Sequence, residues 1–191
     1  KTRDLWSVAP ESVREYLELG LEDSTLESPG PDDFERYRTQ PVVLADASVL
    51  CEAAKASAED RGYTAMILST MIEGESREIA RMHAGIAKEI TRHARPLEPP
   101  CVLVSGGETT VNVGDDPGRG GPNQEFALQC ALEVDSWPSV TALALGTDGT
   151  DGPTEAAGGL VDLNTGERAR SRSIDLFEAL QAHDSTTALE T

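Results

Sequence analysis

The densest group of chemically useful side chains in this sequence lies in the segment 143–159, which reads LALGTDGTDGPTEAAGG. An apolar run at 140–145 predicts a strand, and a loop rich in hydroxyl and carboxylate side chains follows it directly. Glycines at 146, 149 and 152 allow this loop to adopt positive φ angles. Open α/β sheets usually bind ligands beyond the carboxyl ends of their strands. We therefore expect a site here, with Thr147 as a ligand contact and with Asp148 and Asp151 offering the hard oxygens that suit Mg²⁺.

Two further loops have the residue types of a binding site. The first follows the apolar run 101–104, and its glycines allow backbone N–H groups to face an anion, while its carboxylate suits a metal or a substrate hydroxyl. Its candidate residues are Ser105, Gly106, Gly107 and Glu108. The second precedes a predicted helix, whose amino end presents free N–H groups and the positive end of the helix dipole. Its candidates are Arg119, Gly120, Gly121, Asn123, Gln124 and Glu125.

Each loop taken alone also has a purely structural explanation. Asp148 and Asp151 lie among glycines, and both residue types favour turns without any function. Glu125 in a first helical turn complements the helix dipole, and Ser105 at the end of a strand satisfies local hydrogen bonds. The succession of three such loops within one α/β unit favours a ligand site.

Other enzyme templates do not fit the sequence. A dinucleotide-binding fingerprint beginning at Gly118 needs glycine at position 123, where the chain has asparagine, and no Gly-Lys-Ser/Thr of a P-loop occurs. Cys101 and Cys130 lie in apolar runs, which favours packing over a cysteine–histidine nucleophile pair. His83 and His93 fall on one predicted helix, and with His183 they give no metal-binding spacing.

The composition is strongly acidic, with 34 Asp and Glu against 16 Lys and Arg and a net charge of −18. So few basic residues indicate adaptation to high salt, where cations screen the self-repulsion, although an ordinary acidic cytosolic protein is the alternative. Such a surface disfavours nucleic acid and anionic membranes as partners. Three widely spaced cysteines are typical of reduced, packed thiols, and with no apolar run long enough to span a bilayer we expect a cytoplasmic protein.

The periodicity of apolar residues predicts an α/β fold, a layered Rossmann-like domain with a mixed, largely parallel sheet flanked by helices. Residues 1–40 form a leader with one helix, capped by Ser12, and residues 41–191 form the α/β domain. Exposed ion pairs Glu73/Arg77 and Glu78/Arg81 are expected on the longest helix. The predicted helices are 11–21, 48–61, 75–95, 123–134 and 175–182. The predicted extended segments or strands are 42–45, 63–69, 101–104, 109–113, 140–145 and 159–163, with a turn at 164–166.

Four segments, taken in order, resemble the glycerate 2-kinase family, which also carries the label hydroxypyruvate reductase. They are Ile72-Glu73-Gly74-Glu75-Ser76-Arg77-Glu78, Ser105-Gly106-Gly107-Glu108-Thr109-Thr110-Val111, Gly120-Gly121-Pro122-Asn123-Gln124-Glu125 and Gly146-Thr147-Asp148-Gly149-Thr150-Asp151-Gly152-Pro153-Thr154. The similarity covers about residues 42–191, and residues 97–191 resemble the MOFRL domain of that family.

The resemblance implies ATP-dependent phosphorylation of glycerate, commonly to 2-phosphoglycerate, with Mg²⁺ and with an active site between two domains. On that reading Glu108, Asp148 and Asp151 are the candidates for catalytic or metal-organising roles, while Asn123 and Gln124 hold substrate oxygens. Phosphoryl transfer depends mainly on positioning and on charge neutralisation, which these residue types supply.

Two departures from the family pattern affect this expectation. Many relatives have arginine where this chain has Pro122, so Arg119 would have to supply the cation. The amino-terminal half of the family and a final Gly-Pro-Thr-Gly-Thr-Asn-Val-type loop are not in the sequence. We therefore expect a part of a larger two-domain enzyme that folds but is inactive by itself, with a homodimer as a possible assembly. The alternatives are a hydroxypyruvate reductase and a non-catalytic module that binds phosphorylated metabolites.

Overall fold

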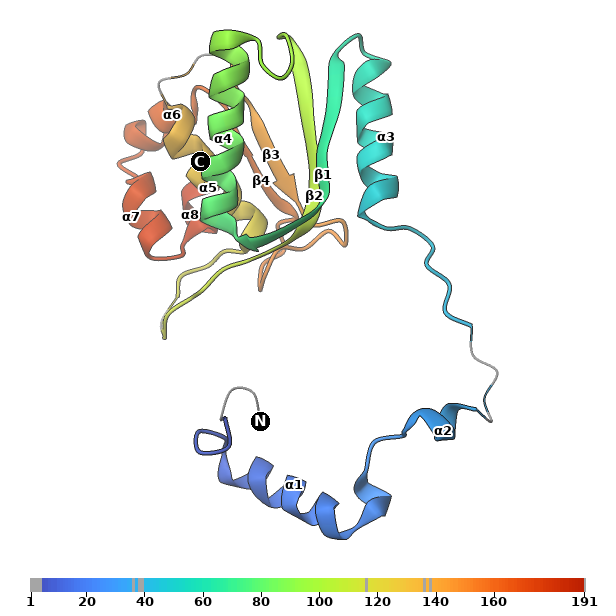
Figure 1. Ribbon diagram of the computed structural model, residues 1–191. Helices are drawn as coiled ribbons and strands as arrows, with labels where there is room; N and C mark the ends of the chain where they lie inside the picture. Colours follow the sequence, from blue (N-terminus) through green and yellow to red (C-terminus); the bar gives the residue numbers. More distant parts are fainter. Residues whose placement is uncertain are drawn as a thin grey trace. The chain divides into compact units, whose positions relative to one another are not determined.

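The structure is a computed structural model that describes residues 5–35, 37, 40–115, 117–135, 137 and 139–190. The chain divides between Leu44 and Ala45 into two compact units, which we describe separately. Figure 1 shows the second unit as layers of helices and strands. Within the described residues, no helix is both long enough and apolar enough to cross a membrane.

The first unit contains α1 (Glu11–Glu22), the short 3-10 helix η1 (Ser24–Leu26) and α2 (Pro31–Phe34). The predicted cap was wrong, since α1 begins one residue before Ser12 and Pro10 occupies the cap position. Pro31 takes the first helical position of α2. The Asp33 carboxylate accepts a hydrogen bond from the Gly30 N–H (3.0 Å), which satisfies this helix start.

The second unit contains two pairs of strands. β1 (Thr64–Glu75) and β2 (Cys101–Thr110) are parallel, whereas β3 (Ala142–Leu145) and β4 (Gly158–Val161) are antiparallel. Parallel and antiparallel pairing therefore both occur, as the predicted mixed sheet requires, although the hydrogen bonds join the strands as two separate pairs. The predicted α/β class with flanking helices is confirmed.

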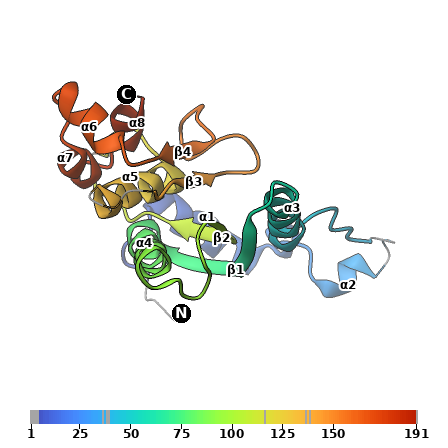
Figure 2. The same ribbon diagram turned by 90° about the horizontal axis from the view of Figure 1, so that it is seen from above.

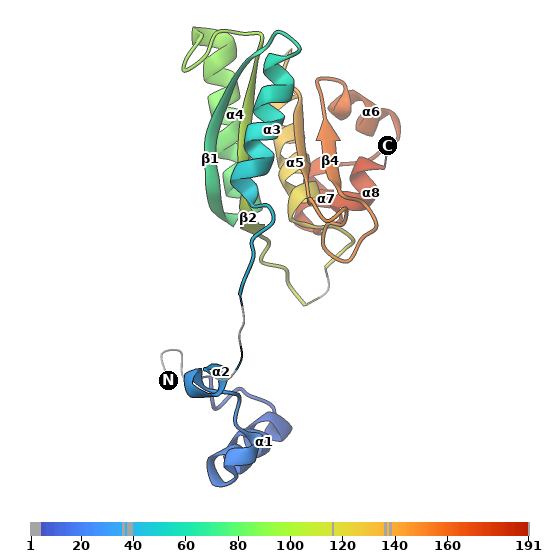
Figure 3. The ribbon, with the colours of Figure 1, turned by 90° about the vertical axis from the view of Figure 1, so that its right-hand side faces the viewer.

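Helices cover both faces of the parallel pair. α3 (Ala47–Glu59) packs against β1 and β2 on one face, and α4 (Ser76–His93) lies on the other face beside α5 (Pro122–Val134). The view from above shows α3 and α4 on opposite sides of these strands (Figure 2). The third view shows α5 between the parallel strands and the carboxyl-terminal helices (Figure 3). Those helices are α6 (Thr165–Ser171), α7 (Leu176–Gln181) and α8 (Ser185–Leu189).

α5 lies at the centre of the hydrophobic core. Small and apolar side chains on this helix allow close packing against β4, α7 and α8. On this helix Phe126 is half-buried, and Ala127, Cys130 and Ala131 are buried. The same cluster includes Leu128, Val161, Leu176, Leu180 and Ala188.

Several predicted boundaries were wrong, and the strand lengths explain most of them. Residues 42–45 are exposed and irregular. β1 continues to Glu75 because β2 also continues through two glycines to Thr110, which keeps the two strands paired. The predicted strands 101–104 and 109–113 are therefore parts of one strand that ends before residue 111. The predicted turn at 164–166 instead leads into α6.

Candidate active site

The loop that follows β3 is joined to the start of α5 by the carboxylate of Asp151. This side chain is 3% exposed. Its Oδ1 accepts from the backbone N–H and the side-chain amide of Asn123 (both 3.0 Å), and its Oδ2 accepts from the backbone N–H (2.7 Å) and the side-chain amide (3.0 Å) of Gln124. Pro122 occupies the first helical position and has no N–H to satisfy. The positive end of α5, which we expected to be open to a phosphate, thus already holds an anion of the chain itself.

Two glycines before α5 make this contact possible. A Cβ at Gly121 would lie 2.4 Å from Cγ of Asp151, and a Cβ at Gly120 would lie 2.3 Å from Oγ of Ser185. The preceding Arg119 is tied to the start of α8, because its carbonyl accepts from the Thr186 N–H at 2.9 Å. The glycine-rich loop is therefore packed between the Asp151 loop and α8.

Gln124 connects the same three segments through its side chain, which is 1% exposed. Its amide nitrogen donates to Asp151 and to Oγ1 of Thr154 (3.0 Å), and its amide oxygen accepts from Oγ1 of Thr186 (2.6 Å). Both polar groups of this buried side chain are satisfied, so the contact stabilises the arrangement of the loops.

Glu125 is buried beside α4, where it forms an ion pair with Arg77. Its other oxygen, Oε2, lies 3.0 Å from Nδ1 of His183, and Arg77 also donates to the carbonyl of Leu180. The predicted surface pair of Glu73 with Arg77 was wrong: Glu73 belongs to β1, and Arg77 points inward. The predicted pair of Glu78 with Arg81 is confirmed.

The first loop is part of β2 and is joined to the other two through α4. Ser76 donates from its hydroxyl to Oγ1 of Thr109 (2.8 Å), and the next residue, Arg77, binds Glu125 on α5. The first turn of α4 therefore links the end of β2 to the start of α5. Glu108 is exposed and lies in register with Glu73 on the neighbouring strand.

Ser105 and Gly106 face opposite sides of the parallel pair, as successive strand residues do. Ser105 faces α4, where its Oγ lies 2.8 Å from Nε2 of His83. A Cβ at Gly106 would lie 2.8 Å from Sγ of Cys51 on α3, so glycine permits the close approach of that helix. Gly107 has a φ of 155°, and a Cβ there would lie 2.0 Å from the carbonyl oxygen of Ile72.

Thr147 and Asp148 are both exposed in the third loop, as are Gly149 and Thr150. Oδ1 of Asp148 accepts from the Thr150 N–H at 3.1 Å, which holds a turn and keeps the carboxylate at the surface. Within the described part of the chain, no three His, Cys, Asp or Glu side chains are placed to hold a metal together. A Mg²⁺ ion usually keeps several waters and binds one or two carboxylates plus substrate phosphates, and Asp148 fits that mode.

The free cysteines are unsuited to nucleophilic chemistry. Cys51 and Cys130 are buried, and Cys101 is half-buried. Burial raises the pKa of Cys130 to about 12, so its reactive thiolate is disfavoured at neutral pH. Burial also raises the pKa of Cys51 and Cys101.

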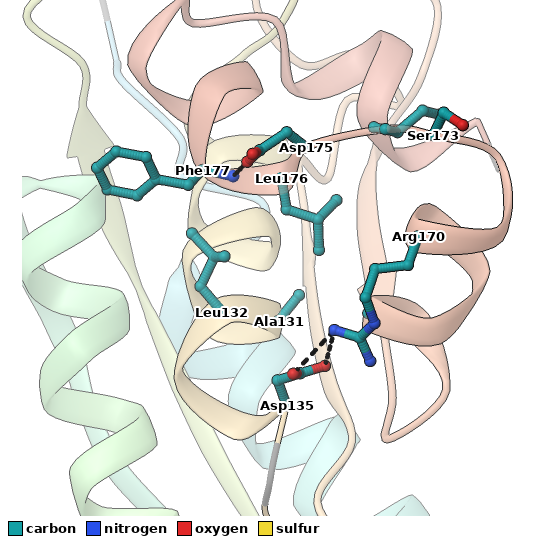
Figure 4. Close-up of a pocket in the computed structure, with 10 residues that line it drawn as sticks. Ala131, Leu132, Asp135, Arg170, Ser173, Asp175, Leu176 and Phe177 are labelled. Atoms are coloured by element: carbon teal, nitrogen blue, oxygen red, sulfur yellow. Dashed lines mark hydrogen bonds and ion pairs between the residues drawn. The ribbon is translucent and has the colours of Figure 1, made fainter.

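One open cavity of the described structure lies away from these loops. It has a volume of about 400 Å³ and is lined by residues of the last turn of α5 and of the segment 166–177. Figure 4 shows the Arg170–Asp135 ion pair at its wall, with Ala131, Leu132 and Leu176 nearby. Because α5 is about 20 Å long at 1.5 Å per residue, the cavity and the glycine-rich loop lie at opposite ends of this helix.

The sequence analysis placed none of three side chains that contact the candidate residues in the site: Arg77, His83 and His183. Arg77 and His183 are 106 residues apart, and neither belongs to a short motif that would predict their contact with Glu125. The helical period could have indicated in part that His83 faces β2, because a helix that covers a strand turns one residue in every three or four toward it.

Together these features define an α/β protein in which glycine-rich loops meet at the amino end of one buried helix. Comparison with known proteins identifies the family, because residues 101–191 match the MOFRL family model. The chain is 40% identical over 190 residues to the glycerate 2-kinase of Pyrococcus horikoshii, which covers 98% of this chain. Residues 101–191 of this chain therefore belong to the MOFRL family.

Solved structures agree with this assignment. The PH0495 protein from Pyrococcus horikoshii has a TM-score of 0.75 at 40% identity and covers 98% of this chain. The glycerate kinase of Thermotoga maritima has a TM-score of 0.74 at 35% identity and covers 91% of this chain. The chain spans 42% of the first structure and 44% of the second, and 42% of the curated Pyrococcus relative.

Proposed function

We propose that the chain is the carboxyl-terminal part of an ATP-dependent glycerate kinase that forms 2-phosphoglycerate. The observation that carries the proposal is the meeting of the 118–125 and 146–154 loops at the start of α5, in a chain 40% identical to a glycerate 2-kinase. The chain spans 42% of that relative, so the reaction belongs to the full-length protein, in a cleft between this unit and a further domain. We expect the chain to be inactive by itself.

Burial divides the candidate residues into two groups. Gln124, Glu125 and Asp151 are at most 3% exposed and are bonded to other parts of the chain, so we assign them to holding the loops. Gly120 and Gly121 allow close approach of Ser185 and Asp151, whereas Gly106 and Gly107 allow close approach of α3 and β1. The side chains left for ligands are those of Ser105, Glu108, Arg119, Asn123, Thr147 and Asp148.

The ligand-facing group supplies what phosphoryl transfer requires. Asp148 would hold Mg²⁺ together with nucleotide phosphates, and the ion would neutralise charge on the transferred group. Glu108 would orient or deprotonate the attacking hydroxyl of glycerate. Arg119 is exposed beside the start of α5 and would supply the cation that Pro122 does not.

The test is the conversion of D-glycerate by the full-length protein that contains this chain, with ATP and Mg²⁺ in concentrated KCl. Phosphoglycerate isomers are separated by chromatography and identified by mass, with Asp148→Asn and Glu108→Gln as site variants. Glu35→Gln, an exposed change in the first unit, serves as the matched control. We expect 2-phosphoglycerate from the wild type and the control, with a loss of at least a hundredfold in the site variants.

Two results would contradict the kinase proposal, and a third would contradict only the assignment of its site residues. Reduction of hydroxypyruvate without phosphoglycerate formation would indicate a reductase. Saturable binding of phosphoglycerate without turnover would indicate a binding module. Full activity in both site variants would remove Asp148 and Glu108 from the site while leaving the kinase assignment intact.

A further inference from the structure

The contact between His83 on α4 and Ser105 on β2 fixes the direction of a hydrogen bond. Nδ1 of His83 lies 2.8 Å from the carbonyl oxygen of Ile79, one helical turn earlier. A carbonyl oxygen can only accept, so Nδ1 must carry a proton and donate. In the neutral ring this leaves Nε2 without a proton, as an acceptor. Nε2 lies 2.8 Å from Oγ of Ser105, so the serine hydroxyl donates its hydrogen to His83.

The surroundings hold both side chains in this arrangement. The His83 ring meets the ring of Phe126 on α5 edge to face, with a centroid distance of 5.3 Å. Ser105 pairs with Ser69 at a point of β1 that is flanked on both sides by register shifts. Such irregularities re-aim side chains and commonly occur next to active sites.

A serine whose hydrogen is already donated can offer a ligand only its lone pairs. It accepts a hydrogen bond from a hydroxyl, but it cannot donate to a phosphate or a carboxylate oxygen. The oxygen suits one of the hydroxyl groups of glycerate, and not its carboxylate or the phosphates of ATP.

We propose that His83 is a positioning residue of this site, which holds Ser105 as a hydrogen-bond acceptor for a hydroxyl of the substrate. The inference rests on the proposed function, since it names the part of glycerate that Ser105 binds. His83 itself contacts Ser105, Ile79 and Phe126, and it acts on the substrate through Ser105.

The variants separate this role from packing. His83→Phe keeps an aromatic ring against Phe126 but has no acceptor, whereas His83→Gln places an amide oxygen near the position of Nε2. Ser105→Ala removes the hydroxyl. His93→Ala is the matched control, because His93 is exposed at the end of the same helix.

The kinetic measurement uses the full-length protein that contains this chain. We expect the KM for glycerate to rise roughly tenfold in Ser105→Ala and His83→Phe, with the KM for ATP unchanged. The double variant should be no worse than either single variant, because both remove the same contact. His83→Gln should recover most of the loss, and His93→Ala should behave as the wild type.

A second measurement, by nuclear magnetic resonance, tests the hydrogen bond between His83 and Ser105 without enzyme turnover. With ¹⁵N-labelled histidine, the neutral His83 ring should show a protonated Nδ1 and a bare Nε2, and Ser105→Ala should shift the Nε2 resonance. A protonated Nε2 with a bare Nδ1 would overturn the inference while leaving the kinase proposal standing. So would a KM for glycerate in His83→Phe equal to that of His93→Ala. If the wild type made no phosphoglycerate, the proposed function and the role in glycerate binding would both fall, while the resonances would still decide the hydrogen bond.

Discussion

At the scale of single residues, the same side-chain type has different tasks according to its burial. Asp148 and Asp151 are three positions apart in one loop, yet the first is exposed and the second is 3% exposed and accepts four hydrogen bonds from α5. The two aspartates therefore make separable contributions to stability and to activity.

Replacement of Asp151 by asparagine should destabilise the fold by about 2–3 kcal/mol, because one oxygen becomes an N–H₂ group that faces donors of α5. Asp148→Asn should change the free energy of unfolding by less than about 0.5 kcal/mol, since its side chain is exposed. Urea unfolding followed by circular dichroism, in the same KCl concentration for both variants, measures the difference. Equal stability of the two variants would contradict the capping role of Asp151.

The ion pairs of α4 allow a second comparison of buried and exposed charge. Glu125→Gln should cost about 3 kcal/mol or more, because Arg77 would keep its charge in a buried place without its partner. Glu78→Gln breaks the exposed pair with Arg81 and should cost less than about 0.5 kcal/mol. Thermal unfolding of both variants checks this order, and a reversed order would show that Arg77 finds another acceptor.

At the scale of elements, close approaches between loops decide where glycine is needed. The sequence could indicate that glycines precede α5, but it could not show which atoms they meet, since Asp151 and Ser185 are distant along the chain. Five helices, α1, α3, α4, α5 and α7, followed from the local period of apolar residues, whereas the short helices α2, α6 and α8 were not predicted. Strand ends were harder to predict, because β1 and β2 continue to Glu75 and Thr110 only as long as each strand is paired with the other.

Gly121→Ala should destabilise the protein by at least about 2 kcal/mol, because its Cβ would overlap Asp151 at 2.4 Å. Gly85→Ala is the control within α4, where an added Cβ meets nothing within 4 Å. Alanine there should stabilise the helix by about 0.5–1 kcal/mol. Chemical unfolding should show a lower free energy of unfolding for Gly121→Ala and a higher one for Gly85→Ala. A loss of stability in Gly85→Ala would contradict the open surroundings of that position.

At the scale of the whole molecule, the charge of −18 is the dominant property. This charge can be counted from the sequence, whereas the internal contacts of Arg77, His83 and His183 could be found only from the folded structure. Buried polar partners come from segments that the chain brings together only after it folds. For that reason the candidate loops could be recognised from the sequence, but the burial of Gln124, Glu125 and Asp151 and the exposure of Asp148 could not be predicted.

We expect the melting temperature to rise as KCl increases from about 0.1 M to 1 M, because the Debye length falls from about 10 Å to about 3 Å and screens the mutual repulsion of carboxylates. Differential scanning calorimetry at several KCl concentrations measures the trend. Sucrose at matched water activity is the control for effects other than screening. A melting temperature that stays constant or falls with KCl would contradict adaptation to high salt.

The anchoring of Asp151 on α5 also limits how the 146–154 loop can vary in length. Two residues separate Asp148 from Asp151, so the backbone between the exposed carboxylate and its fixed anchor can span only about 10 Å. An insertion before Asp148 would leave this short segment unchanged. An insertion between the two aspartates would lengthen the segment, so α5 would no longer fix the position of Asp148. Relatives that use the same geometry should therefore tolerate length changes on one side of Asp148 and not on the other.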